Sequence, residues 1–347
     1  MIYGVHDKRP VGDYDMRKIL IIDEEFNQHS VEKSLIKSKI KESQVVELNY
    51  SLPEILEHKE DTIGILCQID FPISREFLNE FHNLKAISVY GGGYNNIDVK
   101  AATSSGIRVA RSPNYCNHEV AEYVIAMILN FAKKLSYLNG RARKGYWGAG
   151  AVSDAPIDEW SLEEMEDLPQ RVDGSSLLII GYGKIGKLVA KKANALGLTV
   201  MFYDPFVKEY DESMAGKTEL VEGLSNADFI AITASLNDSS TFLINSSNIS
   251  HIKRTAFIIN AARGKIIDET ALIDALNNKR IRGAALDVFT KEPLPIDHPF
   301  FKMDNVFVTP HAIYLSDRSI QELKVLAVNN LLSILAGGKP EGCVNCE

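Results

Sequence analysis

The sequence has few cysteines and no excess of positive charge. It contains 4 Cys and 2 Trp, its formal net charge at pH 7 is −8, and no block of basic residues stands out. A clustered basic patch is the usual signature of nucleic-acid binding, so we do not expect nucleic acid as a partner. Four cysteines in 347 residues are also too few for a disulfide scaffold.

Long apolar runs are missing as well. No segment approaches the roughly 20 apolar residues of a membrane span. Residues 1–15 are polar and lack the apolar core of a signal peptide. We therefore expect a cytoplasmic protein that does not bind membranes. The composition, with 45% hydrophobic and 24% charged residues, is typical of globular proteins, and the length favours two domains.

Two of the cysteines, Cys343 and Cys346, form a C-x-x-C motif near the C-terminus. A zinc site would require a second pair of ligands with similar spacing. A thioredoxin-like redox motif would require a strand-to-helix turn around the cysteines. The sequence offers neither, so we predict no metal site and interpret the pair as part of a C-terminal tail.

A G-x-G-x-x-G motif occupies residues 181–186, directly after the apolar segment 177–180. In a dinucleotide-binding turn the first glycine, here Gly181, adopts an unusual backbone conformation. The second, Gly183, lets the pyrophosphate approach the backbone, and the third, Gly186, allows close packing of helix on strand. The N-terminus of the helix that follows favours a phosphate. The motif therefore predicts a bound dinucleotide.

The residues after the motif complete this unit. A helix is predicted at residues 187–196 and a strand at residues 199–203, and Asp204 follows the strand about 20 residues after the glycines. An acidic side chain at this place accepts hydrogen bonds from the adenosine ribose and repels a 2′-phosphate. The sequence therefore predicts NAD(H) as the cofactor, favoured over NADP(H) by Asp204.

Short apolar strands alternate with helical segments on both sides of the motif, which predicts an α/β fold of two doubly wound parallel-sheet domains. Strands are predicted at residues 18–22, 45–48, 62–67, 86–90, 177–180, 199–203, 229–232, 256–260, 283–287 and 306–308. The main helices are predicted at residues 31–40, 74–81, 99–104, 118–141, 187–196, 269–277 and 320–334. Asn117 is expected to cap the longest helix. The acidic residues 146–171 are expected to form an exposed loop.

Polar residues with useful chemistry follow three strands of the second half: Arg263, Glu292 and His311. Strand ends of a parallel sheet meet at one edge, where dinucleotides bind. An arginine binds a substrate carboxylate in a bidentate fork and polarises the adjacent carbonyl. The histidine is the one plausible acid and base near neutral pH, and a glutamate bonded to it orients the ring and favours its protonated form. Asp287, also at a strand end, is placed to hold the nicotinamide carboxamide.

Each of these residues alone has a simpler interpretation. An Arg-Gly pair after a strand is often a turn with a surface cation, a lone histidine after proline is more often structural than catalytic, and a Glu-Pro pair is an ordinary loop. Their occurrence together, after strands of the same predicted domain, favours an active site.

These runs of residues resemble the NAD-dependent D-2-hydroxyacid dehydrogenase family. The matching runs are residues 181–186, 260–264, 284–293 and 309–311, within a resemblance that extends from about Lys18 to Asn345. It implies two Rossmann-like domains with the active site in the cleft between them, a homodimer, and the roles of the triad given above. The implied domains are a flavodoxin-like substrate domain of residues 1–116 with 314–347 and an NAD-binding Rossmann domain of residues 117–313.

The resemblance also implies which residues contact the ligands. In the loop of residues 89–96, the backbone N–H groups of Gly92 and Gly93 would bind the substrate carboxylate opposite Arg263. The implied cofactor-binding residues are Gly181, Gly183, Lys184, Ile185, Gly186, Asp204, Ala234, Ser235, Ala261, Ala262, Asp287 and His311.

Some positions depart from the family pattern. Asn95 and Ser235 stand where many relatives have Asp and Pro, and Glu292 stands where formate dehydrogenases of the superfamily have Gln, which argues against formate. The substrate stays open among glyoxylate or hydroxypyruvate, lactate-type acids and phosphoglycerate. Co-repressors of the C-terminal-binding-protein type resemble the same family and keep the triad, so an NAD(H)-sensing binding protein is the alternative function.

Overall fold

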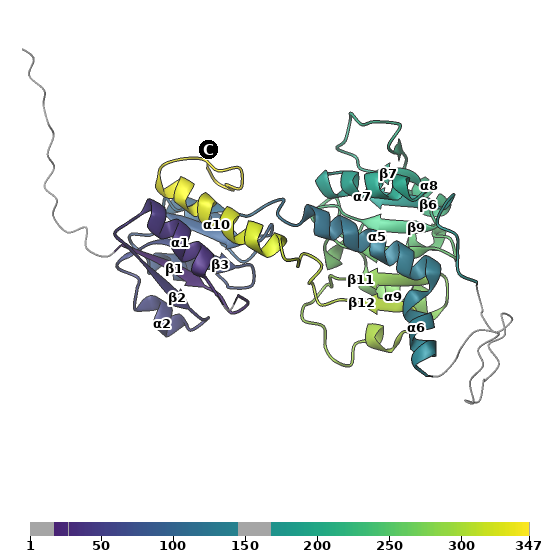
Figure 1. Ribbon diagram of the computed structural model, residues 1–347, viewed down its shortest axis with the longest axis horizontal. Helices are drawn as coiled ribbons and strands as arrows, with labels where there is room; N and C mark the ends of the chain where they lie inside the picture. Colours follow the sequence, from purple (N-terminus) through teal and green to yellow (C-terminus); the bar gives the residue numbers. More distant parts are fainter. Residues whose placement is uncertain (1–16, 27, 145–167, 347) are drawn as a thin grey trace, which may run out of the picture. The chain divides into compact units, whose positions relative to one another are not determined.

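The computed structural model describes residues 17–26, 28–144 and 168–346 (Figure 1). These residues divide into two compact units. The first holds the residues up to Tyr115 and those from Ser316 onward, and the second begins at Cys116 and ends at Leu315. Most of the predicted acidic loop lies outside the described residues. No helix in the described part of the chain has the length and hydrophobicity that a membrane crossing requires.

The first unit contains a five-stranded parallel sheet with the strand order β2-β1-β3-β4-β5, which is the flavodoxin-like order. All seven residues of β3 are buried, as expected for an inner strand covered on both faces. The strands are β1 Arg17–Ile22, β2 Ser43–Leu48, β3 Thr62–Gln68, β4 Ala86–Tyr90 and β5 Arg108–Ala110. The helices are α1 Ser30–Lys39, α2 Leu52–Leu56, α3 Arg75–Asn79, α4 Val99–Ser104 and α10 Ser319–Leu335.

Helices cover both faces of this sheet. Ile19 and Ile21 of β1 belong to one hydrophobic cluster, with Ile36 of α1 and with buried residues of α10. Leu20 of β1 points to the opposite face and packs in a second cluster with buried residues of α2, α3 and α4. Figure 1 shows α10, the last helix of the chain, lying beside α1. A C-terminal helix therefore completes the N-terminal sheet.

A buried ion pair joins α1 to α10. Lys324 Nζ lies 3.5 Å from Oε1 of the fully buried Glu32. The ring of His29 and the hydroxyl of Tyr90 are each 3.2 Å from the same oxygen. Burial raises the pKa of Glu32, but the hydrogen bond from His29 and the charge of Lys324 outweigh it, and the pKa lies below the ordinary value. α10 thus supplies a counter-charge for a carboxylate at the other end of the sequence.

The residues after α10 are not a free tail, and that prediction is wrong. Gly337, with a φ of 82°, follows the end of α10. The chain then returns along β5, where Cys343 forms an antiparallel bridge with Ala110. The sequence did not indicate this attachment because β5 has only three residues and shows no recognisable period.

The second unit contains a seven-stranded parallel sheet with the order β12-β11-β10-β9-β6-β7-β8. β6 lies between β7 and β9, with Leu178 opposite Met201 and Ile230, so the strand order reverses at β6. The strands are β6 Ser176–Ile180, β7 Thr199–Tyr203, β8 Gly216–Lys217, β9 Phe229–Ile232, β10 Phe257–Asn260, β11 Gly283–Leu286 and β12 Val306–Val308. The helices are α5 Asn117–Lys133, α6 Leu135–Arg143, α7 Lys184–Ala195, α8 Leu220–Asn226 and α9 Glu269–Asn277, with short 3₁₀ helices η1 Ile249–His251, η2 Gly264–Ile266 and η3 Pro299–Lys302. The prediction of two doubly wound parallel-sheet domains is confirmed.

The helix predicted at residues 118–141 is two helices. Lys134 has φ 50° and ψ 38°, a left-handed conformation that separates α5 from α6. The Asn130 side chain accepts a hydrogen bond from Ser136 N (3.0 Å), which stabilises the beginning of α6. Asn117 is also not the cap: it is the first residue of α5, and Cys116 occupies the cap position without a capping hydrogen bond from its side chain. The prediction missed both points because they depend on backbone angles and not on hydrophobic period.

Candidate active site

The three glycines of the turn after β6 have three different surroundings. Gly181 has a φ of 94°, and a Cβ there would lie 2.5 Å from the Ala234 backbone. A Cβ on Gly186 would lie 2.3 Å from the Gly181 carbonyl oxygen. Gly183 has open space where a Cβ would be. The first and third glycines are thus required by packing, whereas the second leaves the backbone accessible to a ligand.

α7 begins within this motif, three residues earlier than predicted, and its first residues are Lys184 and Ile185. The cap position is occupied by Gly183, which has no side chain to cap this N-terminus. An uncapped helix N-terminus favours an anion through its N–H groups and its partial positive charge. The turn and the helix together fit a pyrophosphate.

Asp204 follows β7 and is bonded to the glycine turn. Its Oδ2 accepts a hydrogen bond from Tyr182 N (2.9 Å), and its Oδ1 accepts one from Phe206 N (2.9 Å). The carboxylate is therefore held beside the turn. This is the place where the sequence predicts contact with the adenosine ribose.

The small residues after β9 and β10 lie at the same sheet edge. Thr233, at the end of β9, donates a hydrogen bond from its hydroxyl to Gly181 O (2.7 Å), which brings Ala234 against the turn. The carbonyl of Ser235 accepts a hydrogen bond from the Ser240 hydroxyl (2.7 Å), so its loop is internally braced. After β10, Ala261 and Ala262 are both buried. Their small side chains leave the edge of the sheet unobstructed.

Glu292 and His311 form a hydrogen-bonded pair. His311 Nδ1 lies 2.7 Å from Glu292 Oε2, and the other carboxylate oxygen accepts a hydrogen bond from Phe289 N (2.8 Å). His311 follows β12 and has a φ of 54°, which is left-handed and uncommon for a residue with a side chain. Its backbone N donates to Asp287 O (2.9 Å) and fixes this turn. Backbone hydrogen bonds thus hold the carboxylate of Glu292 and the turn that carries His311.

Electrostatics favour an ionised Glu292. Partial burial raises the pKa of Glu292, but hydrogen bonds from His311 and Phe289 lower it, and the charges of His311 and Arg263 lower it further. The net result is a pKa below the ordinary value. The positive charges of His311 and Arg263 thus both favour the ionised form of Glu292.

We expect Glu292→Gln to change how stability depends on pH. A carboxylate whose pKa is lowered in the fold stabilises it above the unfolded value of 4.5, and this contribution is lost as the pH falls through the folded value. Between about pH 6 and about pH 3.5 the wild type should therefore lose more free energy of unfolding than the variant. The measurement is the midpoint of urea unfolding at the two pH values. The exposed Glu57→Gln is the control and should follow the wild type; equal losses in all three proteins would contradict the expectation.

Arg263 lies between β10 and η2 in extended backbone. Asn260 positions it: the Asn260 amide donates to Arg263 O (3.1 Å) and accepts from Ala262 N (3.2 Å). Within the described residues, the guanidinium donates one hydrogen bond, from Nη1 to Ala262 O (2.7 Å). Most of its five N–H donors therefore remain available to a ligand.

Gly264 is packed against the loop that carries Glu292. A Cβ at Gly264 would lie 1.9 Å from Phe289 C and 2.1 Å from Phe289 O. This is the residue whose backbone N–H bonds to Glu292. A glycine after Arg263 therefore sets the spacing between the arginine and the glutamate.

We expect Gly264→Ala to destabilise the protein by about 1–3 kcal/mol because the methyl group has no room. It should also lower kcat, since the Phe289 backbone must move and Glu292 moves with it. Thermal unfolding and steady-state turnover are the measurements. Gly140→Ala is the matched control: this glycine lies within α6 with nothing near its would-be Cβ, and alanine there should stabilise the helix by about 0.5–1 kcal/mol. A Gly264 variant with unchanged melting temperature and kcat would rule out the close packing.

Asp287 is fully buried at the end of β11. Its Oδ1 accepts hydrogen bonds from the Thr309 hydroxyl (2.7 Å) and from Ala312 N (3.0 Å). Its Oδ2 is buried with no hydrogen-bond partner among the described residues. A buried acceptor without a donor is costly. The amide N–H₂ of a nicotinamide carboxamide is a donor of the right kind for it.

Tyr123 of α5 extends this network and was not predicted. Its hydroxyl lies 3.2 Å from the Thr309 hydroxyl, which is bonded to Asp287. Burial raises the pKa of Tyr123 to about 12; the bond to Thr309 works against this shift and the charge of Asp287 adds to it. The sequence contains no signal for this contact, because Tyr123 and Thr309 are brought together only by the packing of α5 on the sheet.

Gly92 and Gly93 belong to the first unit, in the loop after β4. The loop is fixed from the strand beside it: Arg111 Nη1 donates to Gly92 O (3.2 Å), and Ser112 N donates to Gly91 O (2.7 Å). A Cβ on Gly92 would meet nothing within 4 Å. The backbone of this loop is therefore both held and accessible.

Comparisons with known proteins identify the family of the chain. Residues 125–312 match the family model of the D-isomer specific 2-hydroxyacid dehydrogenase NAD binding domain. The chain is 33% identical to a glyoxylate reductase of Thermofilum pendens, over 86% of this chain and 85% of that protein. It is also 33% identical to a D-3-phosphoglycerate dehydrogenase of Methanocaldococcus jannaschii, over 84% of this chain and 53% of that protein. A crystallised 2-hydroxyacid dehydrogenase of Ketogulonicigenium vulgare superimposes with a TM-score of 0.81 at 25% identity, covering 95% of this chain and 99% of that one. The chain belongs to the D-isomer specific 2-hydroxyacid dehydrogenase family.

Proposed function

We propose that the protein interconverts a 2-oxo acid and the corresponding D-2-hydroxy acid with NAD(H). The observation that carries this proposal is the 2.7 Å hydrogen bond between His311 and Glu292, at the edge of the sheet that also bears the glycine turn. The relatives support the substrate class, since they include a glyoxylate reductase and a D-3-phosphoglycerate dehydrogenase.

The cofactor would be held by the glycine turn, the N-terminus of α7 and Asp287. When bound, the nicotinamide supplies or accepts the hydride. Asp204 would accept hydrogen bonds from the ribose hydroxyls, and its charge would repel a 2′-phosphate, so we infer a preference for NAD(H) over NADP(H). The buried Oδ2 of Asp287 would accept a hydrogen bond from the carboxamide, which orients the ring.

The substrate would be bound through its carboxylate. The Arg263 guanidinium offers a planar pair of donors for the two carboxylate oxygens and draws electron density from the adjacent carbonyl. The N–H groups of Gly92 and Gly93 would add main-chain donors to the same carboxylate. With the carboxylate fixed, the reacting carbonyl carbon has a defined position.

The proton would be exchanged by His311. Glu292 bonds to Nδ1, so Nε2 is the nitrogen left to face the substrate. During reduction the imidazolium donates its Nε2 proton to the carbonyl oxygen, and during oxidation the neutral imidazole accepts the hydroxyl proton. Glu292 stabilises the imidazolium and holds the ring, while remaining ionised itself.

A panel of 2-oxo acids tests the proposal. Glyoxylate, hydroxypyruvate, pyruvate and 3-phosphohydroxypyruvate are each assayed with NADH and with NADPH, following absorbance of the reduced nicotinamide. We expect turnover of at least one acid and a higher kcat/KM with NADH. Tight binding of NADH with no turnover of any acid would instead support the NAD(H)-sensing alternative. We also infer a homodimer, which light scattering on the full chain tests.

A further inference from the structure

The C-terminal segment is attached to the edge strand β5 by main-chain hydrogen bonds. Val344 N donates to Val109 O (2.8 Å), and Arg111 N donates to Gly342 O (2.9 Å). The backbone of the segment lies close to the residue that follows β5, since a Cβ on Gly342 would lie 1.9 Å from the Arg111 carbonyl oxygen. The segment therefore fits this edge at a single register.

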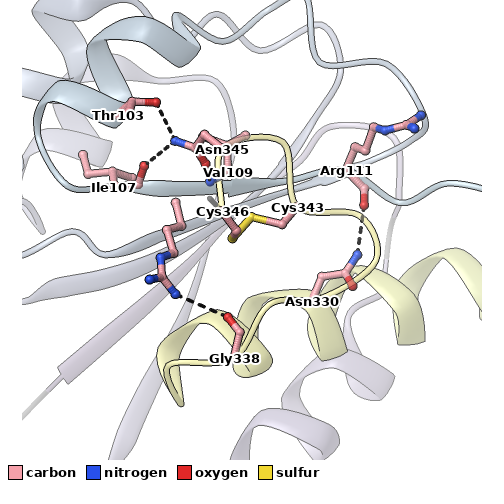
Figure 2. The surroundings of a disulfide bond; sticks show 10 residues. Thr103, Ile107, Val109, Arg111, Asn330, Gly338, Cys343, Asn345 and Cys346 are labelled. Carbon is pink, nitrogen blue, oxygen red and sulfur yellow. Dashed lines mark hydrogen bonds between the residues drawn. A yellow bond between two sulfur atoms is a disulfide. The ribbon is translucent and has the colours of Figure 1, made fainter.

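The Asn345 side chain anchors the end of the segment, as Figure 2 shows. Its Oδ1 accepts a hydrogen bond from Val109 N (2.7 Å). Its Nδ2 donates to the Thr103 hydroxyl (2.8 Å) and to Ile107 O (2.9 Å). One side chain thus bonds to β5 and to the end of the preceding helix and adds to the main-chain bonds of the segment.

A disulfide between Cys343 and Cys346 closes a small ring that contains Asn345 (Figure 2). A disulfide restricts the conformations of the chain it closes, so the ring holds Asn345 in the turn that faces β5. The two sulfurs differ in environment: Cys346 is 5% exposed, whereas Cys343 is partly exposed. An incoming thiol therefore reaches Cys343 first.

Arg111 connects this segment to the glycine loop after β4. Its backbone N bonds to Gly342, and its carbonyl accepts a hydrogen bond from the Asn330 amide of α10 (2.9 Å). Its side chain donates to Gly92 O (3.2 Å). Arg111 therefore contacts both the C-terminal segment and the loop that holds Gly92.

From these contacts we propose that the Cys343–Cys346 disulfide is a reversible redox site, reduced by a dithiol protein of the thioredoxin type, and that its reduction weakens substrate binding through Arg111. A thiolate of the dithiol attacks Cys343 Sγ, the bond between the two cysteines breaks, and Cys346 leaves as a thiolate that takes up a proton. The second thiol of the dithiol loses its proton, attacks the mixed disulfide and releases Cys343. The chain gains two electrons and two protons, and the dithiol becomes a disulfide.

The first test does not depend on enzymatic activity. The full chain is incubated with reduced thioredoxin, and free thiols are then alkylated. After proteolysis, the mass of the C-terminal peptide is measured by mass spectrometry. We expect both Cys343 and Cys346 to become labelled. Amide hydrogen exchange at Val109 and Arg111 should rise on the order of tenfold, because their partners in the segment are released. Absence of labelling, or labelling without faster exchange, would overturn the proposal.

The second test rests on the proposed function and measures KM. Reduction should raise KM for the 2-oxo acid by about fivefold and leave the Kd of NADH unchanged. Cys343→Ser should show the high KM under both conditions. Asn345→Ala should raise KM while the disulfide remains intact. If Cys343→Ser does not fold, Asn345→Ala serves as the test variant in its place.

The matched control is Cys116→Ser, which removes a thiol that is not part of the disulfide and should respond to thioredoxin like the wild type. An unchanged KM in the reduced enzyme would refute the coupling to the substrate loop. If no 2-oxo acid is turned over, the proposed function fails, and the labelling and exchange results still decide the redox site.

Discussion

His311→Asn is expected to lower kcat by about 10²–10⁴-fold, the usual contribution of a positioned acid and base. Asparagine is the informative replacement because His311 has a φ of 54°, and asparagine tolerates a left-handed backbone better than alanine does. The turn after β12 and its backbone bond to Asp287 should then survive. The variant lacks the group that exchanges the proton, so KM for the acid should change little.

Steady-state kinetics over a range of pH check this expectation. The pH dependence of the wild-type rate should change in the variant, because the variant lacks the group that exchanges the proton. His251→Asn is the matched control, since His251 is an exposed histidine of η1; it should keep the wild-type kcat. Retained turnover of several 2-oxo acids by His311→Asn would remove the histidine from the proposed mechanism.

Arg263→Ala is expected to lower kcat/KM by about 10²–10³-fold, because it removes a charged, bidentate contact to the substrate carboxylate. Both parameters should change: KM rises because binding is lost, and kcat falls because the carbonyl is no longer oriented. Arg263→Lys keeps the charge and loses the planar fork, so it should recover only part of the activity. The ratio of kcat/KM between the two variants measures how much of the loss comes from the planar geometry of the guanidinium and how much from its charge.

Arg280→Lys is the control for a change at an exposed arginine, whose surface ion pair with Asp274 contributes little. It should leave kcat/KM and the melting temperature unchanged. The Arg263 variants should also keep the wild-type affinity for NADH, measured by fluorescence. An alanine variant with wild-type kcat/KM on every acid of the panel would mean that the carboxylate is bound elsewhere.

Strand and helix positions were predictable wherever a segment was long enough to show the spacing of its apolar residues. The predicted first and last residues are correct for β4, β7, β9, β12, α4 and α9. The short strands β5 and β8 were missed because two or three residues show no alternation. The break at Lys134 depends on a backbone angle stabilised by Asn130 and Ser136, and a helical period continues across it.

The candidate site was predictable from strand ends because the carboxyl ends of parallel strands share one edge. This rule selected Arg263, Asp287 and His311, and with them Glu292, which follows five residues after Asp287. The supporting contacts were not predictable. The Tyr123–Thr309 pair and the clash that Gly264 avoids are properties of packing between distant segments, and the attachment of the cysteine pair to β5 is another.

The completion of the N-terminal sheet by α10 has a consequence for synthesis on the ribosome. About 200 residues separate β5 from α10, which at bacterial or eukaryotic translation rates is on the order of 10–40 s. During this interval Ile19 and Ile21 lack the helix that covers them, and Glu32 lacks Lys324. The second unit can finish folding first, although it is translated later. The early half of this chain is therefore the half that needs protection from aggregation for longer.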